Sequence, residues 1–226
     1  MEIFSPLITK KTVRAIKIGF IIIAAISFLS QESIAQQESN SPKMVIKTNP
    51  LAALGGPFWV IIVPVTGEYR LMYEIKTTAK QSAMIGASYL GPSLLLNLDQ
   101  ITSDSASIQG INTSGFKLQA MYKFYLSRDI EAPEGLYIGP HISYAQASIV
   151  SNANEMDKVQ AVKMNFNGII GYQLISSGGF ALDLYAGLGF KTLNWNFSGN
   201  SGNIFDFGTD KAVPAVAFGF NFGYAF

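Results

Sequence analysis

The carboxyl-terminal stretch Val213–Phe226 is the feature that most constrains the fold. From Phe218 onward every second residue is aromatic, ending at Phe226, and the residues between are Gly, Asn or Ala. Because side chains on a strand alternate between two faces, the stretch predicts a strand with one aromatic face and one face of small residues. An exposed aromatic face at the end of a chain is an aggregation hazard unless lipid or protein covers it. The cover is either a soluble core or a bilayer, and in the second case the small residues face the inside of a closed barrel.

The same period of two recurs through the body of the chain. It predicts eight strands, at Val45–Leu54, Trp59–Glu74, Ser82–Leu90, Gly115–Leu126, Leu136–Ser148, Val159–Leu174, Phe180–Lys191 and Val213–Phe226. Each has roughly nine residues or more, which is the length that a tilted strand needs to cross a membrane. Longer connections are expected at Gly91–Ser114, Ile149–Lys158 and Asn194–Lys211, alternating with shorter turns. The pattern predicts an all-β fold, an eight-stranded antiparallel up-and-down transmembrane β-barrel, with no helix beyond the leader.

The amino-terminal segment has the parts of a secretory signal peptide. Lys10, Lys11, Arg14 and Lys17 precede the apolar run Ile18–Leu29, and a small residue, Ala35, follows. An apolar run of about twelve residues is too short for a spanning helix, which needs roughly twenty. We therefore expect a signal peptide over residues 1–35, a disordered lead-in over 36–42 and the barrel over 43–226.

Composition excludes several classes of function. Only 14% of the residues are charged, the net charge is +1 and there is no cysteine. The chain therefore has no disulfide, no thiolate metal site and no strongly basic face for nucleic acid. A single histidine leaves no metal-ligand spacing, so neither a metal nor a cofactor is expected.

The sequence as a whole resembles a known class of membrane proteins. The leader, the alternating strands and the terminal FNFGYAF look like the small eight-stranded outer-membrane barrels of Gram-negative bacteria, in the general shape of the OmpA membrane domain and OmpX. The segments NPLAALGGPF, PEGLYIGPHISY and YAGLGF also look like a family of uncharacterised small barrels from such bacteria. In this class, alternate aromatics ending on the last residue are the signal read by the barrel-assembly machinery. The resemblance implies that role for Phe220, Phe222, Tyr224 and Phe226, and it implies location and fold but no activity.

The inward faces predicted by this parity carry charged residues. A polar network low in the lumen is expected from Glu68, Arg70, Lys123, His141 and Asp183, below a more basic upper cavity with Lys117, Lys163 and Lys191. An eight-stranded barrel has room inside only for side chains or one small ligand, so a wide pore is not expected. Buried charges must then be paired or hydrogen-bonded. Trp59, Trp195 and many Tyr and Phe are expected in interfacial girdles.

One motif needs weighing as an active site. His141 and Ser143 are two residues apart on a strand, so they share a face. The spacing resembles the His-x-Ser of outer-membrane lipid A deacylases, but those enzymes place the pair on the lipid side, whereas parity here places it in the lumen. No acidic residue adjacent in sequence orients the histidine. A non-enzymatic role is therefore expected, with the deacylase-like activity as the weaker alternative.

The sequence favours a monomeric outer-membrane protein with a structural or surface-interaction role. Its expected partners are outer-membrane lipid and, during biogenesis, the barrel-assembly machinery; the partner of the loops is unknown. The alternative is a soluble secreted or periplasmic barrel that binds an apolar ligand, in the manner of lipocalins.

Overall fold

The computed structural model describes residues 42–60, 63–64, 66–94, 111–151, 158–198 and 209–226. The predicted signal peptide and residues 36–41 of the predicted lead-in lie outside these ranges. Among the described residues, no helix is long and apolar enough to cross a membrane.

The fold is all-β. The elements are β1 (Met44–Thr48), the 3-10 helix η2 (Pro50–Ala53), β2 (Trp59–Val60), β3 (Val63–Pro64), β4 (Thr66–Thr78), β5 (Gln81–Pro92), β6 (Ile111–Tyr125), β7 (Gly135–Ser151), β8 (Lys158–Ile175), β9 (Phe180–Ser198) and β10 (Thr209–Ala225).

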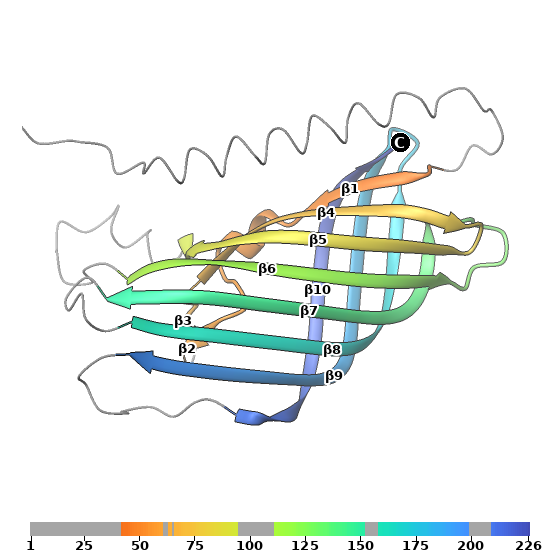
Figure 1. Cartoon of the computed structure of the whole chain (residues 1–226). Helices are drawn as coiled ribbons and strands as arrows, with labels where there is room; N and C mark the ends of the chain where they lie inside the picture. The colour runs from red at the N-terminus through yellow and green to blue at the C-terminus, as the bar shows by residue number, and fades with distance from the viewer. Residues whose placement is uncertain (1–41, 61–62, 65, 95–110, 152–157, 199–208) are drawn as a thin grey trace, which may run out of the picture. The chain divides into compact units, whose positions relative to one another are not determined.

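Eight of the described strands form one closed up-and-down barrel, as the sequence predicts. The order around the wall is β1-β10-β9-β8-β7-β6-β5-β4, every neighbouring pair is antiparallel, and β1 closes the ring by pairing with both β4 and β10. In Figure 1, β4 to β9 lie side by side and β10 crosses behind them. The start of β1, the end of β10 and the short turns between strands all lie at the same opening of the barrel, which we call the termini end. We call the opposite opening the loop end.

The alternation of faces is also as predicted. On β10, Phe218 is 78% exposed and Tyr224 58%, whereas Asn221 is fully buried. On β4, the outward Tyr69 and Leu71 are exposed, and Glu68 and Glu74 are buried. The barrel therefore has an apolar outside and buries charged side chains inside, which is the reverse of the charge distribution of a soluble protein.

The segment between β1 and β4 departs from the prediction. We predicted strands at Val45–Leu54 and Trp59–Glu74, but β1 ends at Thr48 and the barrel strand β4 begins at Thr66. Asn49 and Pro50 explain the early end: the Asn49 side chain accepts a hydrogen bond from Ala52 N at 3.3 Å and caps η2, and proline favours the first helical position. Trp59–Val60 and Val63–Pro64 form the separate two-stranded sheet β2-β3 instead of the start of a wall strand.

Several wall strands extend further than predicted. β9 runs to Ser198 and β6 begins at Ile111, inside segments that we expected to be loops. Polar residues in these extensions weaken the alternation of apolar and polar side chains that predicts a strand. The backbone pairing of β8 with β9 nevertheless continues to Lys158 and Ser198.

Inward glycines leave room for two inward tyrosines. A side chain at Gly171 would collide with the Tyr137 ring, and one at Gly219 would collide with the Tyr185 ring. The lumen of a small barrel is narrow, so large inward residues need small ones opposite.

The short β1 leaves the facing edges of its two neighbours, β4 and β10, unpaired over part of their length, although β4 stays paired with β5 and β10 with β9. β1 pairs with β10 only from Ala225 to Phe222, and with β4 only from Ile75 to Met72. Beyond these pairs, Thr48 Oγ1 donates to Arg70 O at 2.7 Å and Gly56 N donates to Thr66 O, so the segment after β1 follows the edge of β4. In the described part of the chain, β4 and β10 do not pair with each other. The wall is therefore continuous at the termini end and interrupted between β4 and β10 toward the loop end.

Candidate functional site in the barrel lumen

A charged cluster fills the lumen near the termini end. We call it the lower cluster; its members are Lys47, Glu74, Lys123, Gln173 and Asp183, all with at most 1% exposure. Both lysines contact both acids: Asp183 Oδ2 lies 2.7 Å from Lys47 Nζ and 2.9 Å from Lys123 Nζ. Glu74 Oε2 lies 3.0 Å from Lys123 Nζ and also contacts Lys47 Nζ. Two positive and two negative charges therefore balance in one fully buried group.

Neutral side chains complete the lower cluster. Gln173 Oε1 accepts from Lys47 at 2.6 Å and from Lys123 at 2.8 Å. Tyr137 donates to Asp183 at 2.6 Å, and Tyr125 donates to Glu74 at 2.8 Å. Together with Ser82, which donates to Glu74, these residues come from seven of the eight barrel strands. Because buried charges are stable only when paired and hydrogen-bonded, the cluster ties the wall strands together across the lumen.

A second charged group lies closer to the loop end. We call it the upper cluster: Glu68, Arg70, Ser88 and Lys117. Glu68 accepts from Arg70 Nε at 2.7 Å, from Ser88 Oγ at 2.7 Å and from Lys117 Nζ at 3.1 Å. Two cations face one carboxylate, so this group carries an excess positive charge. Nearby, Lys163 Nζ donates to the Pro57 carbonyl at 3.0 Å, which adds a third cation.

His141 and Ser143 lie in the lumen, on the face that parity assigns to them. They are 6% and 2% exposed. Both have asparagines as side-chain hydrogen-bond partners: Asn165 Nδ2 donates to Ser143 Oγ at 2.9 Å, and Asn167 Nδ2 lies 3.3 Å from His141 Nδ1. The His141 ring also lies against Tyr185, with ring centroids 6.1 Å apart. These contacts do not activate a serine as a nucleophile, which requires a base hydrogen-bonded to its hydroxyl.

A cavity of about 240 Å³ lies among these groups. Its lining includes the upper-cluster residues Glu68, Arg70 and Lys117, the polar residues His141, Ser143, Lys163, Asn165, Asn167 and Tyr185, the segment Gly55–Pro57 and β10 at 216–218. The lining combines three cations with one carboxylate.

An apolar plug lies between this cavity and the loop end. Phe58 is 1% exposed and packs on Leu90, Ala145, Ala147 and Ala161, which face the lumen from three wall strands. Trp195 meets Phe58 edge to face with ring centroids 6.0 Å apart. The expectation of a girdle position for Trp195 is therefore wrong: its position on β9 is odd, and the odd residues of that strand point inward. The side chain of Trp59 is not described.

The structure divides the predicted lumen network. Lys123 and Asp183 belong to the lower cluster, Glu68 and Arg70 belong to the upper one, and His141 contacts Asn167. Of the three predicted upper bases, Lys117 pairs with Glu68, Lys163 lines the cavity and Lys191 is half-buried on β9. The predicted network lacks Lys47, Glu74 and Gln173 of the lower cluster, although the alternation that places Glu68 inward also places Glu74 inward three positions further along the same face.

The terminal aromatics lie on the outer surface at the barrel seam. Phe220 and Phe222 stack edge to face with centroids 5.3 Å apart, and Phe180 of β9 lies 6.2 Å from Phe222. The backbone of Phe226 donates to Met44 O at 2.9 Å and accepts from Met44 N at 3.0 Å. The last residue therefore takes part in closing the barrel.

The described residues contain no group of three or more His, Cys, Asp or Glu that could hold a metal ion. No model of a known protein family matches the sequence, and a search of curated proteins found no match.

Proposed function

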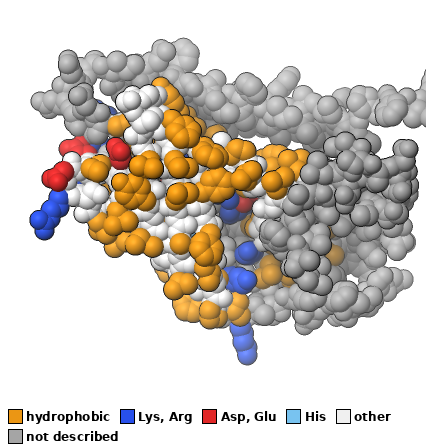
Figure 2. All heavy atoms as spheres, turned by 180° about the vertical axis from the view of Figure 1, so that it is seen from behind, with side chains coloured by type: hydrophobic (Ala, Val, Ile, Leu, Met, Phe, Trp, Pro, Cys, Tyr) orange, Lys and Arg blue, Asp and Glu red, His pale blue; other side chains and the backbone are white. Residues whose placement is uncertain are grey.

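We propose that this chain is an integral outer-membrane β-barrel with a structural or surface-interaction role and a lumen closed by its own side chains. The observation that carries the proposal is the reversed distribution of polarity. Apolar side chains cover the outside, with Leu188 71% exposed and Phe166 60%, while Lys47, Glu74 and Asp183 are buried inside. Figure 2 shows the hydrophobic side chains spread over the face of the barrel seen from behind. A surface this apolar is stable only when lipid or another protein covers it.

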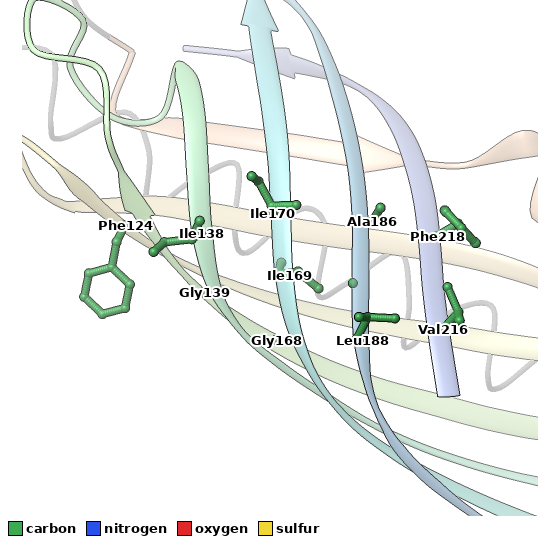
Figure 3. A pocket seen from close by; sticks show the side chains of 11 residues that line it. Phe124, Ile138, Gly139, Gly168, Ile169, Ile170, Ala186, Leu188, Val216 and Phe218 are labelled. Carbon is green, nitrogen blue, oxygen red and sulfur yellow. The ribbon is translucent and has the colours of Figure 1, made fainter. Parts of the chain in front are cut away.

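The outer surface also has a shape suited to acyl chains. Gly168 and Ala186 are small outward residues, and around them Ile138, Ile170, Leu188 and Phe218 border a groove of about 680 Å³. Figure 3 shows these side chains projecting from adjacent strands. In a bilayer, lipid tails fill such grooves without any polar cost, which supports the lipid cover over a soluble state.

The lipocalin-like alternative requires the opposite arrangement. A soluble barrel that binds an apolar ligand needs an apolar interior and a polar exterior. Here the described interior holds the lower and upper clusters, and the exterior is apolar. The arrangement disfavours this alternative.

The membrane location has a direct test. We expect the protein in the outer-membrane fraction of a Gram-negative host, resistant to alkaline carbonate and released only by detergent. Unheated samples should migrate faster in a denaturing gel than boiled ones, because the closed barrel survives the detergent until heated. Recovery in the periplasmic supernatant without detergent would contradict the proposal.

The closed lumen predicts an absence of steady current. In planar bilayers the purified barrel should show no stable single-channel conductance, because the lower cluster, with the Ser82, Tyr125 and Tyr137 side chains bonded to it, fills the lumen with buried groups from seven strands. A porin prepared in the same way serves as the positive control. A stable current of porin size would show that the lumen is open.

A further inference from the structure

We propose that the lumen cavity between the upper cluster and the plug binds a small anionic group, a phosphate or a carboxylate. This goes beyond the membrane role, and it depends on the inside of the barrel whatever covers the outside. The cavity of about 240 Å³ corresponds to the volume of roughly eight water molecules. That is room for a phosphate or carboxylate with a short polar substituent, and too little for a sugar chain or an acyl tail.

Charge selects the class of ligand. Arg70, Lys117 and Lys163 line the cavity against a single acid, Glu68. Glu68 accepts from Arg70 Nε and from the ammonium of Lys117, and Lys163 gives one hydrogen bond to Pro57. Arg70 also donates from Nη1 to Asn221 Oδ1 at 3.4 Å and is hydrogen-bonded to Tyr185. A guanidinium has five N–H donors and an ammonium has three, so each cation keeps donors for a further acceptor. A buried excess of positive charge is costly unless an anion balances it.

Two buried polar side chains lining the cavity have atoms without a hydrogen-bond partner. His141 Nε2 and Asn167 Oδ1 are such atoms, and the residues are 6% and 2% exposed. When Asn167 Nδ2 donates to His141 Nδ1, the imidazole proton lies on Nε2, which is then a free donor. The cavity thus offers a neutral donor, cationic donors and one amide acceptor, which suits an anion that also carries a hydroxyl group.

The interrupted wall gives the cavity a route to the outside. Residues 216–218 of β10 line the cavity, and they lie beyond Phe222, where the pairing of β10 with β1 ends. Figure 2 shows Lys and Arg side chains with a carboxylate in a recess beside the hydrophobic surface. Either a free solute or the headgroup of a lipid in the surrounding leaflet can supply an anion through such a side opening.

The test is a calorimetric titration, which measures the heat of ligand binding to the folded barrel in nonionic detergent. The probes are inorganic phosphate and glycerol 3-phosphate, with glycerol as the neutral control, and separate micelles contain phosphatidylglycerol or phosphatidylcholine. We expect saturable binding of at least one anion, no binding of glycerol, and an affinity that falls as salt is raised. Binding of free glycerol 3-phosphate identifies a solute site, whereas a response restricted to phosphatidylglycerol identifies a headgroup site. Absence of both responses in barrel that keeps its heat-modifiable mobility overturns the proposal.

Substitutions of residues that line the cavity test whether the anion binds there. Lys163→Gln keeps a donor for Pro57 but removes the charge, and His141→Ala removes the free ring nitrogen; each should weaken anion binding about tenfold. Lys191→Gln is the matched control, because Lys191 also faces inward, on β9 opposite Asn165, but does not line the cavity. Lys158→Gln, at the exposed start of β8, is the second control. Equal losses in Lys163→Gln and Lys191→Gln would show general charge screening instead of a built site and would contradict the proposal.

Discussion

Asp183→Asn should destabilise the barrel by about 3–5 kcal/mol, because it leaves two buried lysines facing a single carboxylate. In the parent, Asp183 Oδ2 lies within 2.9 Å of both Lys47 Nζ and Lys123 Nζ, and all three side chains are inaccessible to solvent. The asparagine keeps the volume but cannot balance the charge. The measurement is the denaturant midpoint of unfolding in detergent, together with the temperature at which the fast-migrating gel form is lost.

Two further variants separate charge balance from packing. Glu131, in the turn before β7, forms a partly exposed ion pair with Lys76 of β4. Exposed ion pairs contribute about 0–1 kcal/mol to stability, so Glu131→Gln should lower it by no more than that. Asp183→Asn combined with Lys123→Met removes one charge of each sign, and we expect it to recover part of the loss. An Asp183→Asn barrel as heat-resistant as the parent would contradict the role of the lower cluster.

The alternation of residues was enough to predict the wall of the barrel. Period two fixes which residues share a face, and the faces of β4 to β10 are those that the sequence indicates. The interruption after β1 was harder to predict, because Trp59–Glu74 keeps one alternation through β2, β3 and the start of β4. The signals for a break were Asn49-Pro50 and Gly55-Gly56-Pro57, and they end β1 and redirect the chain into the lumen.

The partners within the lumen could not be predicted from parity. Parity gives the face of a residue but not its height in the barrel, which depends on the stagger between strands. Lys117 and Lys123 share a face of β6, yet one pairs with Glu68 and the other with Glu74 and Asp183. Gln173 appeared to be an ordinary polar lumen residue, whereas it accepts hydrogen bonds from both lysines of the lower cluster.

The outer surface gives the second large effect: Leu188→Arg should destabilise the barrel in a bilayer by about 2–4 kcal/mol, the cost of a cation on the lipid face near mid-membrane. Leu188 lies near the middle of β9 (Phe180–Ser198), faces outward and is 71% exposed. In a soluble protein an arginine at so exposed a position changes stability by no more than about 0.5 kcal/mol. The variant therefore tests the lipid cover itself.

The matched control is Asn196→Arg, on the same face of the same strand but near the loop end, where Asn196 is exposed. The cost of a charge falls to about 0–1 kcal/mol near the membrane interface, so this arginine should be tolerated. Leu188→Ala removes apolar surface without adding charge and measures the contribution of the side chain alone. The readout is the unfolding midpoint of barrels refolded into vesicles. A clear ranking, with Leu188→Arg well below both controls, is the expected result. Equal stability of the two arginine variants would mean that bilayer depth does not distinguish these positions, and the proposed spanning arrangement would be wrong.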